Sequence, residues 1–168
     1  MLESPRLTLR PFQPSDRDPL VALLSDEAVM KFSVSGPKPA ADILEDLDEW
    51  TRNHKPQEPQ RWAVIGRSDG RFLGFCGFSF HRIEHELLWE LGYRLFPDVW
   101  GCGFATEAAT ACRDWFFRVR SEDRFALMID PANVASARVA EKIGARHEFD
   151  AVCYGIPVGI YIARRSSQ

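Results

Sequence analysis

The hydrophobic pattern of residues 1–53 predicts one strand followed by two helices. Residues 6–12 alternate polar and apolar side chains, as a half-buried strand does. Pro11 lacks a backbone N–H, so this strand is expected at a sheet edge. Residues 14–24 and residues 40–53 instead repeat their apolar positions with the period of a helix.

The middle of the chain returns to strand-like patterns. Residues 62–65, 72–80 and 87–96 are rich in aromatic, β-branched and other apolar side chains. Residues 68–70 have the composition of a tight turn between the first two of these segments. Because short connections join strands that run in opposite directions, an antiparallel meander is expected here.

Helices and strands alternate in the last third of the chain. Residues 103–118 and 134–143 have a helical period, and the apolar run at residues 125–129 reads as a buried strand. Two further strands are expected around residues 148–154 and 158–164. The predicted order is β-α-α-β-β-β-α-β-α-β-β, an α/β (α+β) fold with a mixed, mostly antiparallel sheet of about seven strands.

The composition is typical of one compact domain and excludes several classes of protein. With 168 residues, 45% of them hydrophobic, the chain can bury a core without disulfides or a structural metal. It has no run of about 20 apolar residues that would predict a membrane span. A net charge of −3 gives no basic field for nucleic acid. The four cysteines are widely spaced, so we expect reduced thiols and a cytoplasmic protein.

A glycine turn at residues 101–106 joins a predicted strand to a predicted helix. The first N–H groups of a helix have no partner within the helix and lie at the positive end of its dipole. This segment therefore suits a pyrophosphate, although an ordinary strand-to-helix turn explains it equally well. It lacks the Lys-Ser/Thr of nucleotide triphosphatases and the third glycine position of dinucleotide-binding enzymes, so both classes are disfavoured.

Three groups of motifs, in this order, resemble the GNAT superfamily of acyl-CoA-dependent N-acetyltransferases. They are LESPRLTLRP at residues 2–11, LGYRL with WGCGFATEA at residues 91–108, and NVASARVAEKIG at residues 133–144. Within the superfamily they are most similar to the ribosomal-protein N-terminal acetyltransferase (RimJ/RimL-like) branch. The resemblance implies a single GNAT-type domain over residues 1–168, with helices on both faces of the sheet and acetyl-CoA as the acetyl donor.

The resemblance also implies which residues bind acetyl-CoA. The pyrophosphate would lie on backbone amides of residues 101–106, and the pantetheine would add as a strand to a splayed sheet edge. The expected set is Leu95, Phe96, Pro97, Trp100, Gly101, Cys102, Gly103, Phe104, Ala105, Thr106, Asn133 and Ser136. Asn133 is equally typical of a helix N-cap, with Ser136 as its first-turn partner.

Transfer from a thioester to an amine needs a neutral amine, so a general base helps. Glu90 matches a glutamate base found in many members of the superfamily, and a solvated strand carboxylate is the alternative. The tyrosine acid of many members is replaced by Ala140, so the thiolate is protonated by Ser136, by water, or not at all before release. Glu107 matches a glutamate frequent in the branch, and the helix dipole explains it as well.

Other functions remain in competition with this interpretation. A non-catalytic acyl-CoA sensor would keep the pyrophosphate loop without turnover. The segment containing His81, Glu84 and His85 spells the His-x-x-Glu-His of a zinc hydrolase, but that motif needs a helix and its flanks predict a hairpin, so no metal is expected.

The acceptor amine also stays open. A protein N-terminus and a small amine, such as a polyamine, an amino acid or an antibiotic, are both considered. Acceptor residues are expected in the segment from Phe32 to Trp50 and in the last strands. The acidic residues of the segment from Phe32 to Trp50 would attract a basic partner or simply form a solvated face. They are Asp42, Glu45, Asp46, Asp48 and Glu49. A homodimer is compatible with the resemblance.

Overall fold

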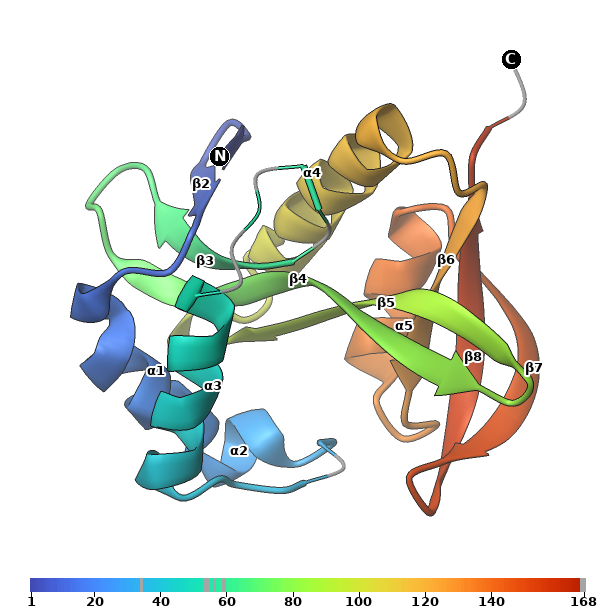
Figure 1. The fold of residues 1–168 in the computed structure, drawn as a ribbon, viewed down its shortest axis with the longest axis horizontal. Coiled ribbons are helices and arrows are strands. Elements are labelled where there is room, and N and C mark those ends of the chain that lie inside the picture. Colours follow the sequence, from blue (N-terminus) through green and yellow to red (C-terminus); the bar gives the residue numbers. More distant parts are fainter. Residues whose placement is uncertain (34, 53–54, 56, 59, 167–168) are drawn as a thin grey trace.

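The computed structural model describes residues 1–33, 35–52, 55, 57–58 and 60–166, and one twisted sheet crosses the molecule (Figure 1). The strands are β1 (Leu2–Glu3), β2 (Leu7–Arg10), β3 (Arg61–Gly66), β4 (Phe72–Ile83), β5 (Glu86–Leu95), β6 (Arg124–Ile129), β7 (Arg146–Cys153) and β8 (Ile156–Arg164). The helices are α1 (Arg17–Leu24), α2 (Glu27–Met30), α3 (Ala40–Arg52), α4 (Phe104–Val119) and α5 (Val134–Lys142), with 3₁₀ turns at Pro14–Asp16 and Pro97–Val99. Position 53, included in the expected second helix, lies outside the described residues.

The strand order in space is β1-β2-β3-β4-β5-β6-β8-β7. All described neighbours run antiparallel except β5 and β6, which are parallel. The helices cover both faces of the sheet, with α1, α2 and α3 on one face and α4 and α5 on the other (Figure 1). The mixed, mostly antiparallel fold with helices on both faces is therefore confirmed.

The N-terminal strands differ from the expectation. The described sheet has eight strands rather than about seven, because Leu2 and Glu3 pair with Leu9 and Thr8. The strand predicted for residues 6–12 was expected at the sheet edge. This prediction was wrong, since the corresponding strand β2 has neighbours on both sides. Pro11 follows the last residue of β2, so its missing N–H removes no bond from the ladder. The four-residue helix α2, which is too short to show a period, was also missed.

Two hydrophobic layers hold the helices to the sheet. On one face Phe116 of α4 packs with Phe78 and Phe125 of the strands, at ring-centroid distances of 4.8 and 5.2 Å. On the other face Leu20 of α1 and Ile43 of α3 are fully buried. The sheet is thus covered on both sides. None of the described helices is long and apolar enough to span a membrane.

The parallel pair β5–β6 opens shortly after it forms. Its register includes only the pair Glu90 and Ala126, whereas β4 and β5 pair continuously from Gly74–Leu95 to Ile83–Glu86. After Glu90 the β6-facing edge of β5 therefore has no strand partner among the described residues. This divergence leaves a cleft in the middle of the sheet.

Candidate active site

A cleft of about 650 Å³ occupies the opening between β5 and β6. It is lined by both strands, by the starts of α4 and α5, and by residues of α2 and its C-terminal end. Of the residues expected to act here, Glu90, Leu95, Trp100, Gly101, Gly103, Phe104, Ala105, Thr106, Asn133 and Ser136 line the cleft. Phe96, Pro97 and Cys102 are not part of the lining.

The glycine turn before α4 presents unpaired main-chain donors. Gly101 and Gly103 have φ angles of 75° and 83°, in the left-handed region that favours glycine. A Cβ atom on Gly101 would meet nothing within 4 Å, so the dihedral angle rather than space requires glycine there. The amides of residues 101–106 donate to no described residue, and the first to do so is Glu107, to the Gly103 carbonyl over 3.0 Å. Such a row of amides suits an anion.

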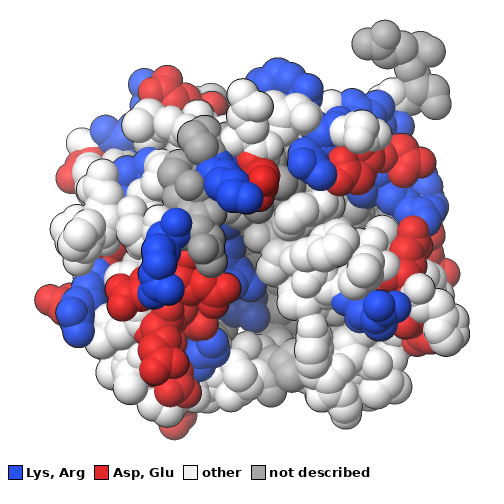
Figure 2. Space-filling model, in the orientation of Figure 1, with Lys and Arg blue, Asp and Glu red and all other residues white. Residues whose placement is uncertain are grey.

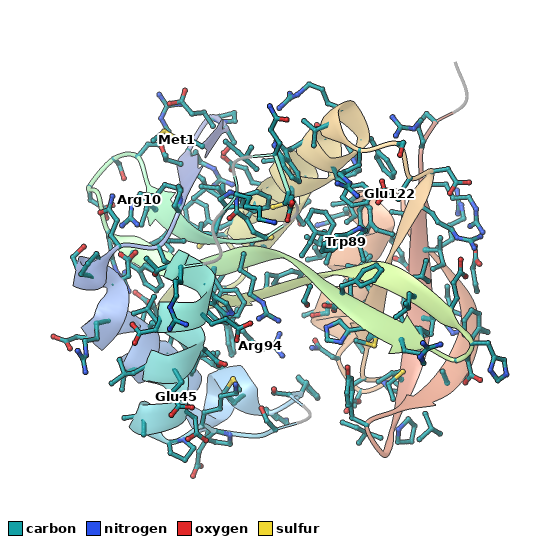
Figure 3. All side chains as sticks on the ribbon, in the orientation of Figure 1. Met1, Arg10, Glu45, Trp89, Arg94 and Glu122 are labelled. Carbon is teal, nitrogen blue, oxygen red and sulfur yellow. The ribbon has the colours of Figure 1, made fainter. Side chains whose placement is uncertain are left out.

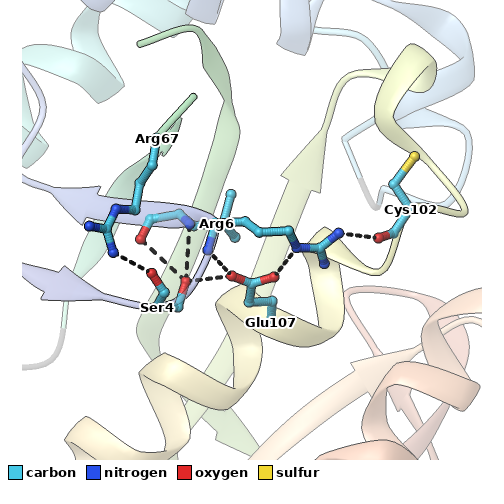
Figure 4. Close-up of polar contacts among 6 residues, drawn as sticks. Ser4, Arg6, Arg67, Cys102 and Glu107 are labelled. Atoms are coloured by element: carbon cyan, nitrogen blue, oxygen red, sulfur yellow. Dashed lines mark hydrogen bonds and ion pairs between the residues drawn. The ribbon is translucent and has the colours of Figure 1, made fainter. Parts of the chain in front are cut away.

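An ion-pair network fixes this turn to the N-terminal strands (Figure 4). Glu107 Oε2 accepts from Arg6 Nε over 2.7 Å, and Glu107 Oε1 accepts from Ser4 Oγ over 2.7 Å. Arg6 Nη1 donates to the Cys102 carbonyl over 3.0 Å. Burial raises the pKa of Glu107, but the hydrogen bonds from Ser4 and Arg6 outweigh it and leave the pKa below its usual value. Glu107 therefore braces the turn in addition to any effect of the dipole.

Residues 95–97, which are expected to bind the pantetheine, lie at the end of β5 and in the turn that follows it. The Phe96 amide already donates to the Leu73 carbonyl over 3.0 Å, and Pro97 begins a 3₁₀ turn. The Leu95 carbonyl accepts from Trp100 Nε1 over 2.7 Å. Since β5 has no β6 partner after Glu90 among the described residues, residues 91–94 are also open to an added strand. The Trp100 side chain therefore links the glycine turn to the end of β5.

The first turn of α5 carries a serine that faces β5 across the cleft. Asn133 is the N-cap of α5, and its Oδ1 accepts from the Ser136 amide over 3.1 Å. The Tyr93 hydroxyl donates to Ser136 Oγ over 3.1 Å. Burial raises the pKa of Tyr93 to about 12, so the phenol stays protonated. Ala140, where a tyrosine acid would stand, is fully buried.

Sequence reasoning missed the role of Tyr93 as the partner of Ser136. Strand alternation places Tyr93 on the face of β5 opposite Glu90, and no hydrogen-bond partner can be read from that position. The replacement of the usual tyrosine by Ala140 was the one signal that another hydroxyl should be sought near Ser136.

Glu90 lies on the face of β5 that is covered by α1, α2 and α3. Its Oε2 accepts from Ser79 Oγ over 3.4 Å, across the β4–β5 ladder. Ser79 Oγ also contacts His81 Nε2 at 2.9 Å, and His81 Nδ1 lies 2.5 Å from the Tyr154 hydroxyl. A hydrogen-bonded chain therefore joins Glu90 to an exposed tyrosine.

The segment that spells a zinc motif belongs to the β4–β5 hairpin. His81 lies in β4, Glu84 has a φ of 52° in the connection, and His85 precedes β5. The helix that a zinc hydrolase would need is not formed, so that alternative is wrong and the expected hairpin is confirmed. Among the described residues, no group of three or more His, Cys, Asp or Glu side chains could hold a metal ion.

Comparison with known proteins agrees with this geometry. Residues 6–146 match the family model described as an acetyltransferase (GNAT) domain. The Bacillus subtilis protein YkkB, which is uncharacterized, is 34% identical over 95% of this chain and 93% of its own length. The uncharacterized N-acetyltransferase YnaD of the same organism is 29% identical over 85% of this chain and 81% of its own. A GNAT-family acetyltransferase from Bacillus anthracis has the same fold, with a TM-score of 0.82, 25% identity and 97% coverage of both chains.

The chain therefore belongs to the acetyltransferase (GNAT) domain family. It is an N-acetyltransferase that uses acetyl-CoA. The residues present fit this donor, because unpaired amides at residues 101–106 suit the pyrophosphate and the bare edge at residues 91–94 suits the pantetheine. Arg138 and Lys142 of α5 add positive charge to the lining, which suits a phosphorylated donor.

Proposed function

We propose that this N-acetyltransferase transfers the acetyl group directly to a primary amine bound beside Glu90, on the α1–α3 side of the cleft. The observation that supports this most strongly is the position of the cleft. It connects the glycine turn before α4 with the Glu90 side chain through the opening between β5 and β6. A donor and an acceptor can therefore meet in one ternary complex.

Bound acetyl-CoA supplies an acetyl group activated as a thioester. In our proposal Glu90 accepts a proton from the acceptor ammonium, because only the neutral amine attacks a carbonyl carbon. Ser136, which accepts a hydrogen bond from Tyr93, can direct its own hydroxyl hydrogen at the thiolate. Amides of residues 101–106 hold the donor by its pyrophosphate.

The RimJ/RimL-like branch remains part of the proposal. A putative ribosomal-protein-serine acetyltransferase from Vibrio cholerae has the same fold, with a TM-score of 0.75 at 19% identity. So does the spermidine N-acetyltransferase of that organism, with a TM-score of 0.78 at 18% identity. The fold thus accommodates both a protein acceptor and a small amine.

Three further expectations belong to the same proposal. Residues 1–168 form a single N-acetyltransferase domain, which the family match over residues 6–146 supports. A cytoplasmic location is supported by the free thiols of the four cysteines. A homodimer is compatible with the resemblance to the family.

The experiment that tests the proposal has two stages. Calorimetry with purified protein and acetyl-CoA measures donor binding first. Release of free thiol is then followed with N-terminal peptides, polyamines and amino acids as acceptors. Binding with turnover on one acceptor class supports the proposal. Binding without turnover on any of them favours the acyl-CoA sensor, and no binding rejects the donor site.

A further inference from the structure

Two arginines on the acceptor side of the cleft have no carboxylate partner among the described residues. Arg94 lines the cleft, and its single hydrogen bond to a described residue runs from Nη1 to the Tyr93 carbonyl over 2.7 Å. Arg61 donates from Nη2 to Ser79 Oγ over 3.2 Å and lies 4.9 Å from the ring centroid of Trp50. Most of the guanidinium donors of both residues are thus uncommitted.

Both arginines are half-buried. Burial lowers the pKa of Arg94 and of Arg61, while Glu90 acts in the opposite direction on both without forming an ion pair with either. A guanidinium that is partly shielded from water is stabilised by an anion with matching geometry, and a carboxylate pairs with it through two parallel hydrogen bonds. A ligand that supplies a carboxylate would complete this arrangement.

No side chain projects from β5 between Glu90 and Arg94, because the residue between them on that face is Gly92. The two residues share one face of β5 with Gly92 between them, and about 13 Å separates their Cα atoms along the strand. A Cβ atom on Gly92 would lie 3.3 Å from Glu90 Oε2, so the carboxylate leans over this glycine toward Arg94. Gly92 pairs with Gly77 of β4, which also lacks a side chain. A small molecule can therefore lie between the carboxylate and the guanidinium.

The charged side chains around Gly92 favour a zwitterionic acceptor over a polycationic one. Lys31 also lines the cleft, so two basic groups and Glu90 face the acceptor. Asp46 and Glu49 of α3 face Arg61 and partly offset its charge. Acidic side chains gather over α3 in Figure 2, beside a hollow with basic atoms at its depth, where Figure 3 labels Arg94. A polyamine would bring further positive charge against the guanidinium groups.

We infer that the acceptor carries a carboxylate close to its amino group, as an amino acid does, with the ammonium at Glu90 and the carboxylate at Arg94. This inference rests on the proposed acetyl transfer at the same cleft. The nitrogen–carbon bond of the amide forms as the carbon–sulfur bond of the thioester breaks. Of the two protons that the ammonium loses, one goes to the thiolate and the other passes through Glu90 to solvent.

The test compares each L-amino acid with its α-amide, which keeps the amine and removes the negative charge. Thiol release is measured at saturating acetyl-CoA for the wild type, Arg94→Gln, Arg94→Lys and the control Arg82→Gln, an exposed arginine of β4 outside the cleft. We expect at least one acid to exceed its amide by about 30-fold in kcat/KM, the value of a charge-assisted pair. Arg94→Gln should abolish that preference by raising the KM of the acid far more than the KM of the amide, and Arg94→Lys should keep part of the preference.

Several outcomes would overturn the inference while the proposed function stands. They are equal rates for acids and amides, turnover on polyamines or peptides alone, and an Arg94→Gln effect that is the same for acid and amide. Thermal unfolding of each variant shows whether a loss of activity comes from a missing contact or from unfolding. If Arg94→Gln does not fold, Arg94→Lys is used in its place. Failure to bind acetyl-CoA in calorimetry would instead reject the proposed function, and this inference with it.

Discussion

The two ends of the cleft present different parts of the chain, main-chain amides at one end and charged side chains at the other. At the donor end the proposed binding groups are main-chain amides of residues 101–106, in a turn shaped by Gly101 and Gly103. At the acceptor end the proposed groups are side chains from two strands, Glu90 and Arg94 of β5 with Arg61 of β3 beside them. We therefore expect donor binding to tolerate most side-chain changes outside the two glycines. At the acceptor end, each side chain should affect acceptor binding or turnover in its own way.

This difference matches what each ligand requires. Acetyl-CoA is one constant molecule, and a turn built from the backbone at a helix N-terminus suits its pyrophosphate whatever the neighbouring side chains are. Acceptors differ between enzymes, and side chains can change one at a time. Substitutions at the two ends should accordingly affect different constants, the donor Kd at one end and the acceptor KM or kcat at the other.

The largest effect should follow from Glu90→Gln. Loss of the base should lower kcat by at least about 100-fold, while the Kd of acetyl-CoA stays within about twofold. The remaining rate should rise with pH, because the acceptor then loses its proton to water. Glu86→Gln is the control, since Glu86 lies on the same face of β5 and pairs with Arg124 outside the cleft. A variant with the wild-type kcat would show that Glu90 is not the base.

The next effect should come from Gly101→Val, compared with Gly70→Val. Gly101 and Gly70 have φ angles of 75° and 69°, and a Cβ on either would meet nothing within 4 Å. Both substitutions should therefore lower the free energy of unfolding by about 2 kcal/mol. Only Gly101→Val should raise the Kd of acetyl-CoA, by about 30-fold, in calorimetry. Equal Kd values for the two variants would mean that the turn does not hold the donor.

A smaller effect is expected from Tyr93→Phe, which removes the hydroxyl that donates to Ser136. Without that hydrogen bond the Ser136 hydroxyl loses its orientation, and kcat should fall by about 10-fold with the acceptor KM unchanged. Since the pKa of Tyr93 is about 12, the loss should be the same at every neutral pH. Tyr161→Phe, outside the cleft lining, should leave kcat unchanged. A change in KM alone would assign Tyr93 to acceptor binding instead.

The smallest effect should come from Glu107→Gln, which loosens the turn without touching the ligand. We expect the Kd of acetyl-CoA to rise about threefold and the free energy of unfolding to fall by about 1 kcal/mol. Glu122→Gln, which breaks a similar ion pair with Arg120 away from the cleft, is the control and should leave the Kd unchanged.

The same variant should show a defined pH dependence. The pKa of Glu107 is lowered in the folded chain, so its contribution to stability is complete above the ordinary value of 4.5 and is lost as the pH falls through the folded value. Chemical denaturation between about pH 6 and pH 3 should therefore show the difference between wild type and Glu107→Gln shrinking as the pH falls. A difference that is constant over this range would mean that the carboxylate charge is not what braces the turn.

Local patterns predicted most of the fold. The order of the longer strands and helices, the β4–β5 hairpin and the glycine turn all follow from periods and turn residues in short stretches of sequence. Strand β1 and helix α2 were missed because two and four residues show no period. The edge position of β2 was wrong because β1 exists only by pairing with it.

Within the candidate site, the sequence by itself determined the groups that act through the backbone. Gly101, Gly103 and the first amides of α4 depend on dihedral angles that neighbouring residues set. Only the tertiary structure decided the pairs that join distant segments, such as Tyr93 with Ser136 and Arg6 with Glu107, which are 43 and 101 residues apart. The divergence of β5 from β6, which leaves the edge of residues 91–94 unpaired, and the half-buried position of Arg94 without a carboxylate partner among the described residues also depend on the tertiary structure. The physical reason is that hydrogen bonds, burial and charge act over a few ångströms in space, whatever the separation along the chain.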